Sequence, residues 1–164
     1  MNNLKDIKEV MNYSLLDKYD IEDFEGRRLY INDIIDNQIV DGIVYHILRY
    51  NREDKGIPVE ERKPIILYVN SNGGSVPAGY AFIAAIRTSK TPVYTVNQGY
   101  CYSMGFLIFL ARLKRFSMAS STFLMHDGST MGWDSTAKMK DRMDFETNQV
   151  ERHTKKYILS RTTI

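Results

Sequence analysis

Three short stretches of this sequence carry residue types that are suited to acyl-transfer chemistry. Gly73 and Gly74 follow an apolar run, Ser103 lies in the stretch 99–105 (GYCYSMG), and His126 ends a second apolar run. A serine hydroxyl attacks a carbonyl near neutral pH only when a base such as histidine takes its proton. The tetrahedral oxyanion that forms needs hydrogen-bond donors already aimed at it. These residue types therefore suggest a serine nucleophile, a histidine base and a backbone oxyanion hole.

The positions of these residues between the expected elements bring them together. Ser103 opens an expected helix, so the amide of Met104 points outward at a helix N-terminus and is a candidate oxyanion donor. Gly74 precedes another expected helix, and without a side chain its amide approaches a ligand closely. Each feature also has a simpler interpretation, since the glycine pair suits a turn, Ser103 a helix cap and His126 a polar strand end.

The apolar pattern predicts an α/β fold with a largely parallel sheet. Helices are expected at 36–50 and 104–112, and Pro77 sits early in a further helix, where a missing amide is tolerated. Strands are expected at 28–31, 65–69, 93–96, 115–118 and 122–125. Because strand ends on one side of a parallel sheet meet at a shared crevice, the alternation favours a common site for Ser103 and His126.

Composition sets limits on the class of protein. The chain has 164 residues, of which 43% are hydrophobic and 26% charged, as expected of one soluble domain. A net charge of +2 gives no reason to expect nucleic acid as a partner. No signal-peptide pattern opens the sequence, so we expect a cytoplasmic protein. The longest apolar run, at 106–111, is too short to cross a membrane and is expected to be a buried helix.

The other residues with reactive or metal-binding side chains are not expected to form a functional site. Cys101 is a lone cysteine and is expected to pack in the core rather than to act as a nucleophile. His46 and His153 have no acidic or cysteine cluster at ligand spacing, so no metal site is expected. No cofactor is expected either, and no phosphate-binding loop for ATP is present.

The segment Ala137–Leu159 contains neither glycine nor proline and is expected to be one long helix. Glu146 interrupts an otherwise apolar stripe along it. That stripe consists of Met139, Met143, Val150 and Tyr157. So narrow an apolar stripe is poorly suited to burying this helix in its own small domain. Two alternatives remain: the helix packs against another subunit, or it faces solvent with one apolar edge.

Three ordered motifs resemble the proteolytic subunit family of the Clp protease, ClpP. They are residues 68–79 (YVNSNGGSVPAG), 103–105 (SMG) and 124–126 (LMH), and the resemblance extends from Arg28 to the C-terminus. It implies a crotonase-like fold of stacked βαβ units with a long C-terminal handle helix, which Ala137–Leu159 fits. It also implies that such subunits stack as two heptameric rings around a chamber.

The resemblance implies roles for individual residues. Ser103 is the implied nucleophile and His126 the implied general base, with the amides of Gly74 and Met104 as the oxyanion hole. In the family, a hydrophobic pocket docks loops of the Clp ATPase. The matching positions here are Ile66, Tyr68 and Phe116, for which simple core packing is the alternative.

The domain organisation follows from the same resemblance. We expect a mobile N-terminal segment over residues 1–27, whose apolar residues show no sustained period. An α/β head domain is expected over residues 28–130, and the handle helix over residues 131–164. The expected function is a serine endopeptidase that hydrolyses unfolded polypeptides delivered by a Clp-family ATPase. A crotonase-like acyl-CoA enzyme and a non-catalytic ring subunit remain alternatives.

The sequence departs from the family pattern at three places. Asn72 replaces a frequent proline, and Asp127–Gly128 replace a frequent Gln-Pro, without touching the reacting atoms. The family's triad aspartate lies beyond the handle helix, in a segment this chain lacks after Ile164. Asp127 is not expected to substitute, because adjacent strand residues point to opposite faces. We therefore expect the sequence to be truncated and these 164 residues alone to be nearly inactive.

Overall fold

The computed structural model describes residues 14–112, 114–126, 136–145 and 150–162. Its centre is a five-stranded sheet in which every pairing is parallel. The strands are β1 (Arg28–Ile31), β2 (Ile65–Ser71), β3 (Val93–Tyr102), β4 (Arg115–Ser117) and β5 (Thr122–Leu124). The expected α/β fold with a parallel sheet is confirmed.

The long strand β3 organises the sheet. Its first half pairs with β4, and its second half pairs with β5 through Tyr100, Cys101 and Tyr102. On its other side it pairs with β2, which pairs in turn with β1. The far end of β3 and the end of β5 therefore reach the same edge of the sheet.

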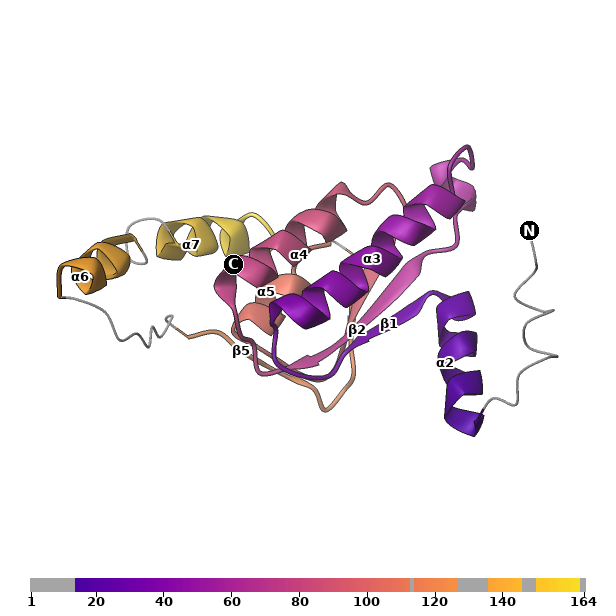
Figure 1. Cartoon of the computed structure of the whole chain (residues 1–164), viewed down its shortest axis with the longest axis horizontal. Coiled ribbons are helices and arrows are strands. Elements are labelled where there is room, and N and C mark those ends of the chain that lie inside the picture. The colour runs from indigo at the N-terminus through magenta and orange to yellow at the C-terminus, as the bar shows by residue number, and fades with distance from the viewer. Residues whose placement is uncertain (1–13, 113, 127–135, 146–149, 163–164) are drawn as a thin grey trace.

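Helices cover one face of this sheet. They are α3 (Asn37–Glu53), α4 (Val76–Thr88) and the short α5 (Met104–Phe109). Figure 1 shows α3 and α4 side by side across the sheet. A one-turn 3₁₀ helix, η1 (Val59–Glu61), lies in the charged connection between α3 and β2.

Alternation along β2 shows how the core forms. Ile65, Leu67 and Val69 are fully buried, whereas Ile66 and Tyr68 between them are only partly buried. Successive strand residues point to opposite faces, so the buried set faces the helices. Val40, Ile43 and Ile47 follow one another at helical spacing on one face of α3, and they pack into the same core.

The helix α2 (Leu15–Gly26) lies where the sequence pattern indicates no element. It is mostly exposed, so apolar periodicity gives no signal for it. Its N-terminus is fixed instead by a capping box, in which the Ser14 hydroxyl accepts from the Asp17 amide and the Asp17 carboxylate accepts from the Ser14 amide. Whether residues 1–27 are mobile stays a prediction.

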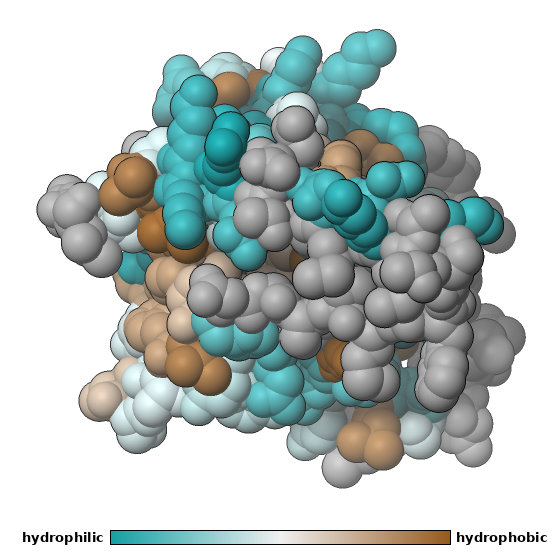
Figure 2. Space-filling model, turned by 90° about the vertical axis from the view of Figure 1, so that its left-hand side faces the viewer, coloured by the Kyte–Doolittle hydropathy of each residue, from teal (hydrophilic) through white to brown (hydrophobic). Residues whose placement is uncertain are grey.

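The expected handle contains two described helices, α6 (Thr136–Phe145) and α7 (Arg152–Leu159), with residues 146–149 outside the described part of the chain. They project to one side of the sheet (Figure 1). Figure 2 views the molecule from the side on which α6 and α7 lie. Hydrophobic patches are visible there beside hydrophilic ones.

Contrary to the expectation from its thin apolar stripe, α7 packs on its own domain. Tyr157 is buried in the core, and its hydroxyl donates to the Leu107 carbonyl at 3.2 Å. Thr154 is also buried and shares a hydrogen bond of 2.7 Å with the Tyr80 hydroxyl. Burial of the Tyr157 and Ile158 side chains together with these two hydrogen bonds docks α7 on the head domain.

Within the described ranges, no helix is long and apolar enough to cross a membrane.

Candidate active site

Ser103 occupies a sharp turn between β3 and α5. Its backbone has φ 50° and ψ −120°, a conformation that non-glycine residues rarely adopt. Two hydrogen bonds hold the turn, from the Ser103 amide to the Leu124 carbonyl at 2.8 Å and from the Phe106 amide to the Ser103 carbonyl at 3.0 Å. The Ser103 side chain makes no capping bond to α5, which argues against a mere helix cap. Backbone strain of this kind clusters at functional sites, where a sharp strand-to-helix turn exposes a nucleophile.

The glycine pair lies directly against this turn. Gly73 has φ 101° and Gly74 φ 148°, which a side chain would strain. A Cβ added to Gly73 would lie 2.7 Å from the Ser103 Cβ and 3.0 Å from the Met104 nitrogen. The close approach of the two backbones therefore requires glycine at position 73.

A bridge to Ile35 fixes the glycine loop. The Ile35 amide donates to the Gly73 carbonyl at 2.8 Å, and the Ser75 amide donates to the Ile35 carbonyl at 2.7 Å. In a parallel bridge of this type the middle residue, here Gly74, turns its own amide away from the partner. No hydrogen bond among the described residues uses the amide of Gly74 or of Met104. Both amides remain available as donors.

His126 reaches the same site from β5. It lies two residues beyond the end of β5, which runs parallel to the last part of β3. Ser103, Met104 and His126 line one pocket of about 300 Å³. The structure thus brings the sequence-predicted serine and histidine to a common cavity, and both are accessible to solvent.

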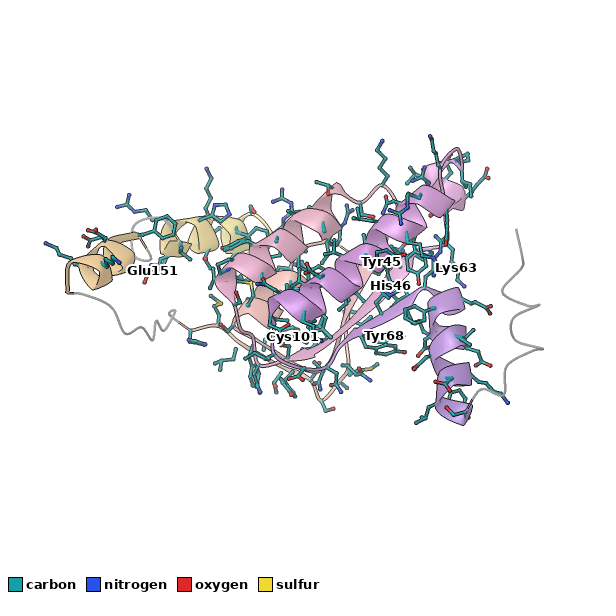
Figure 3. All side chains as sticks on the ribbon, viewed as in Figure 1. Tyr45, His46, Lys63, Tyr68, Cys101 and Glu151 are labelled. Carbon is teal, nitrogen blue, oxygen red and sulfur yellow. The ribbon has the colours of Figure 1, made fainter. Side chains whose placement is uncertain are left out.

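This pocket is also lined by α7 and the residues just before it. Apolar side chains of Val76, Leu107 and Met125 contribute from α4, α5 and the segment after β5. The contribution of α7 and the residues before it consists of Val150, Glu151, Thr154, Lys155 and Ile158. Figure 3 shows Glu151 beside the ribbon at this end of the molecule. Sequence reasoning missed this contribution, although the apolar stripe through Val150 was a signal that the segment packs on something.

The family model for Clp protease matches residues 17–163 of this chain. The chain belongs to the Clp protease family. Among curated proteins it is 38% identical to the ATP-dependent Clp protease proteolytic subunit 2 of Treponema pallidum (strain Nichols), over 104 residues that cover 62% of this chain and 49% of that protein.

Two further relatives carry the same description. The protein of Treponema denticola is 44% identical over 66 residues, covering 39% of this chain and 33% of the relative. The protein of Borreliella burgdorferi is 42% identical over 67 residues, covering 40% and 34% respectively. The matched segments span half or less of the length of these relatives.

Cys101, the other nucleophile type near the site, is unsuited to catalysis. It lies fully buried on β3, with its thiol 3.7 Å from the Val69 carbonyl (Figure 3). Burial raises the pKa of this thiol to about 12, so the reactive thiolate is scarce at neutral pH. The assignment of Cys101 to the core is confirmed.

The remaining histidines pack against aromatic rings. The His46 ring lies 4.5 Å from that of Phe24, and burial lowers the pKa of His46. The His153 ring meets Tyr80 edge-on at 5.0 Å. In the part of the chain that the structure describes, no group of three or more histidine, cysteine or acidic side chains is placed to hold a metal.

The residues matched to the family's ATPase-docking pocket lie on the sheet face opposite the helices. Tyr68 stacks on Tyr30, with ring centroids 4.9 Å apart, and both belong to one row across the sheet with Phe116. Tyr30 is 44% and Phe116 50% exposed, and Ile66 is partly buried on the same face. The alternative of simple core packing is therefore wrong for Phe116.

Proposed function

We propose that this chain is the serine endopeptidase subunit of a self-compartmentalising, ATP-dependent Clp-type protease. Membership of the Clp protease family supports peptidase activity. The observation that carries the serine mechanism is the strained turn at Ser103, which presents its side chain next to a free helix-terminal amide and the glycine loop.

In the first half of the reaction, His126 takes the proton of the Ser103 hydroxyl while the Ser103 oxygen attacks the carbonyl carbon of a peptide bond. The carbonyl oxygen becomes an oxyanion, which accepts hydrogen bonds from the amides of Gly74 and Met104. When the tetrahedral intermediate collapses, His126 donates its proton to the departing amine. An acyl-enzyme on Ser103 remains.

In the second half, water replaces the amine. His126 removes a proton from water, the resulting oxygen attacks the acyl carbon, and Ser103 leaves with the proton that His126 returns. A carboxylate that fixes the tautomer of His126 completes such a site. By the family resemblance this role falls to an aspartate that follows the handle segment.

The same proposal includes the assembly. Subunits stack as two heptameric rings through the segment that contains α6 and α7, in the cytoplasm. A Clp-family ATPase docks on the exposed sheet face around Tyr68 and feeds unfolded polypeptide into the chamber.

The direct test is peptide hydrolysis by the protein as its gene encodes it. Ser103→Ala removes one oxygen and should lower turnover of a fluorogenic peptide by at least about 10³-fold without changing the far-UV spectrum or the assembly state. Ser117→Ala, an exposed serine on β4, is the matched control and should keep full activity. Retained hydrolysis in Ser103→Ala would exclude the serine mechanism. Turnover of an acyl-CoA by that variant would favour the crotonase-like alternative.

A further inference from the structure

A second pocket, of about 380 Å³, has four cations among its eight lining residues. Arg87, Arg112, Lys114 and Arg161 surround it, and it shares no lining residue with the pocket of Ser103. Arg87 lies in the last turn of α4, Arg112 follows α5, and Arg161 follows α7. Four positive charges thus meet from three helix ends and the start of β4.

Part of this charge has a structural partner. The Arg112 Nη2 donates to the Ser89 carbonyl at 2.6 Å, at the C-terminal end of α4. Cations are favoured at helix C-termini, where carbonyls and the helix dipole are negative. This contact accounts for one nitrogen of Arg112 and not for the convergence of all four side chains.

Two guanidinium donors of the pocket are not satisfied, whereas the Lys114 ammonium donates to the Tyr94 hydroxyl at 3.3 Å. The Nε atoms of Arg112 and Arg161 are buried and have no hydrogen-bond acceptor. Within the described ranges, no ion pair joins any of the four cations to a carboxylate. Burial, together with Arg161 and Arg87, lowers the pKa of Arg112, so the cations repel one another. Buried donors and like charges without counter-charge are costly unless something supplies acceptors.

We propose that this pocket binds an oxyanion, either a carboxylate or a phosphate group, on the guanidinium groups of Arg112 and Arg161. A guanidinium presents parallel N–H groups that match both kinds of oxyanion, and such charge-assisted bonds are strong. Arg87 and Lys114, which are exposed, form the outer rim. The oxyanion is either a free ion such as inorganic phosphate or a carboxylate of a polypeptide.

The sign of a stability change tests this proposal. In an empty pocket, Arg161→Gln relieves repulsion and should leave the melting temperature unchanged or raise it. In a pocket that holds an oxyanion, the same substitution removes a ligand-binding group and should lower it. Arg52→Gln, an exposed position on α3, removes the same charge elsewhere and is the control.

The experiment measures melting temperatures with inorganic phosphate against sodium chloride at equal ionic strength. For a free oxyanion, phosphate at ten times its dissociation constant should raise the melting temperature of wild type and Arg52→Gln by roughly 3 to 6 °C, and not that of Arg161→Gln. For a polypeptide carboxylate, phosphate has no effect, and Arg161→Gln melts below Arg52→Gln by an amount that shrinks in high salt. A phosphate effect equal in all three proteins would overturn the proposal. So would the absence of any phosphate effect combined with an Arg161→Gln variant that shows no loss or a salt-independent loss.

Discussion

At Ser103, function depends on a backbone conformation that residue type alone does not specify. The sequence shows a serine before a helix, and a helix cap is the commoner reason for that arrangement. The φ of 50° is imposed by neighbours far away in the chain, through the Leu124 carbonyl and the glycine loop at position 73. The serine, the histidine and the two glycines could therefore be chosen from the sequence, whereas the geometry that makes them a site needed the structure.

Gly73→Ala tests how much this geometry depends on the close approach of two backbones. The added methyl strains a φ of 101° and collides with the Ser103 turn, so we expect a loss of about 2 to 4 kcal/mol in the free energy of unfolding and a loss of peptidase activity. Gly42→Ala in α3, where nothing lies within 4 Å, should instead gain roughly 0.5 to 1 kcal/mol. Urea unfolding measures both. Equal stability of the two variants would contradict the account.

Among the elements, an ion pair joins the end of α3 to the starts of β1 and β3. Both Nη atoms of Arg27 donate to Asp54 at 2.7 Å, and the Thr91 hydroxyl donates to the same carboxylate at 2.7 Å. Asp54 is buried. These contacts hold the pKa of Asp54 below its ordinary value, chiefly through the Arg27 hydrogen bonds.

Asp54→Asn should therefore destabilise the fold in a pH-dependent way. It leaves Arg27 without its counter-charge and should cost roughly 3 kcal/mol at pH 7. Because the folded pKa of Asp54 is depressed, its contribution is complete above the ordinary value of 3.8 and is lost as the pH falls through the lower folded value. Unfolding of both proteins between pH 7 and pH 3 tests this. Glu53→Gln, an exposed neighbour, should cost less than about 1 kcal/mol, and a pH-independent deficit in Asp54→Asn would count against the argument.

A separate prediction concerns ATPase docking on the outward face of the sheet. Tyr68→Ala or Phe116→Ala should lower ATPase-dependent degradation of a folded protein by at least about tenfold, because large exposed aromatic side chains dominate docking surfaces. Hydrolysis of a short peptide should be unchanged, since neither residue lines the pocket of Ser103. Leu48→Ala, an exposed apolar position on α3, is the control. Full ATPase-dependent activity in both aromatic variants would place docking elsewhere.

Elements differed in how well the sequence predicted them. Continuous apolar runs and helical spacing identified the strands and α3, because burial dictates both patterns. α2 left no such pattern, since its stability comes from a capping box on an exposed helix. The packing of α7 on its own domain was missed because an apolar stripe does not tell which surface it covers. In the structure Tyr157 enters the core, and the Thr154 and Tyr157 hydroxyls bond to Tyr80 and Leu107.

At the scale of the whole molecule, α6 projects away from the head domain (Figure 1), in a position suited to contact between subunits, whereas α7 packs on that domain. We predict stacked heptameric rings, which native mass spectrometry will count directly. Met143→Glu on α6 should separate the rings, because a charge in an apolar contact between subunits must be desolvated. Lys140→Gln on α6 is the control and should leave the assembly intact. A stable monomer at micromolar concentration would contradict the proposed architecture.

The central claim, that Ser103 is an activated nucleophile, is tested most directly by a fluorophosphonate probe on the protein as its gene encodes it. Such a probe reacts with a serine whose proton a neighbouring base removes, and it leaves an adduct that peptide mapping by mass spectrometry assigns to one residue. We predict one adduct per subunit, on Ser103, and none in Ser103→Ala. An adduct on a different serine, or a protein that hydrolyses peptides without acquiring any adduct, would contradict the account.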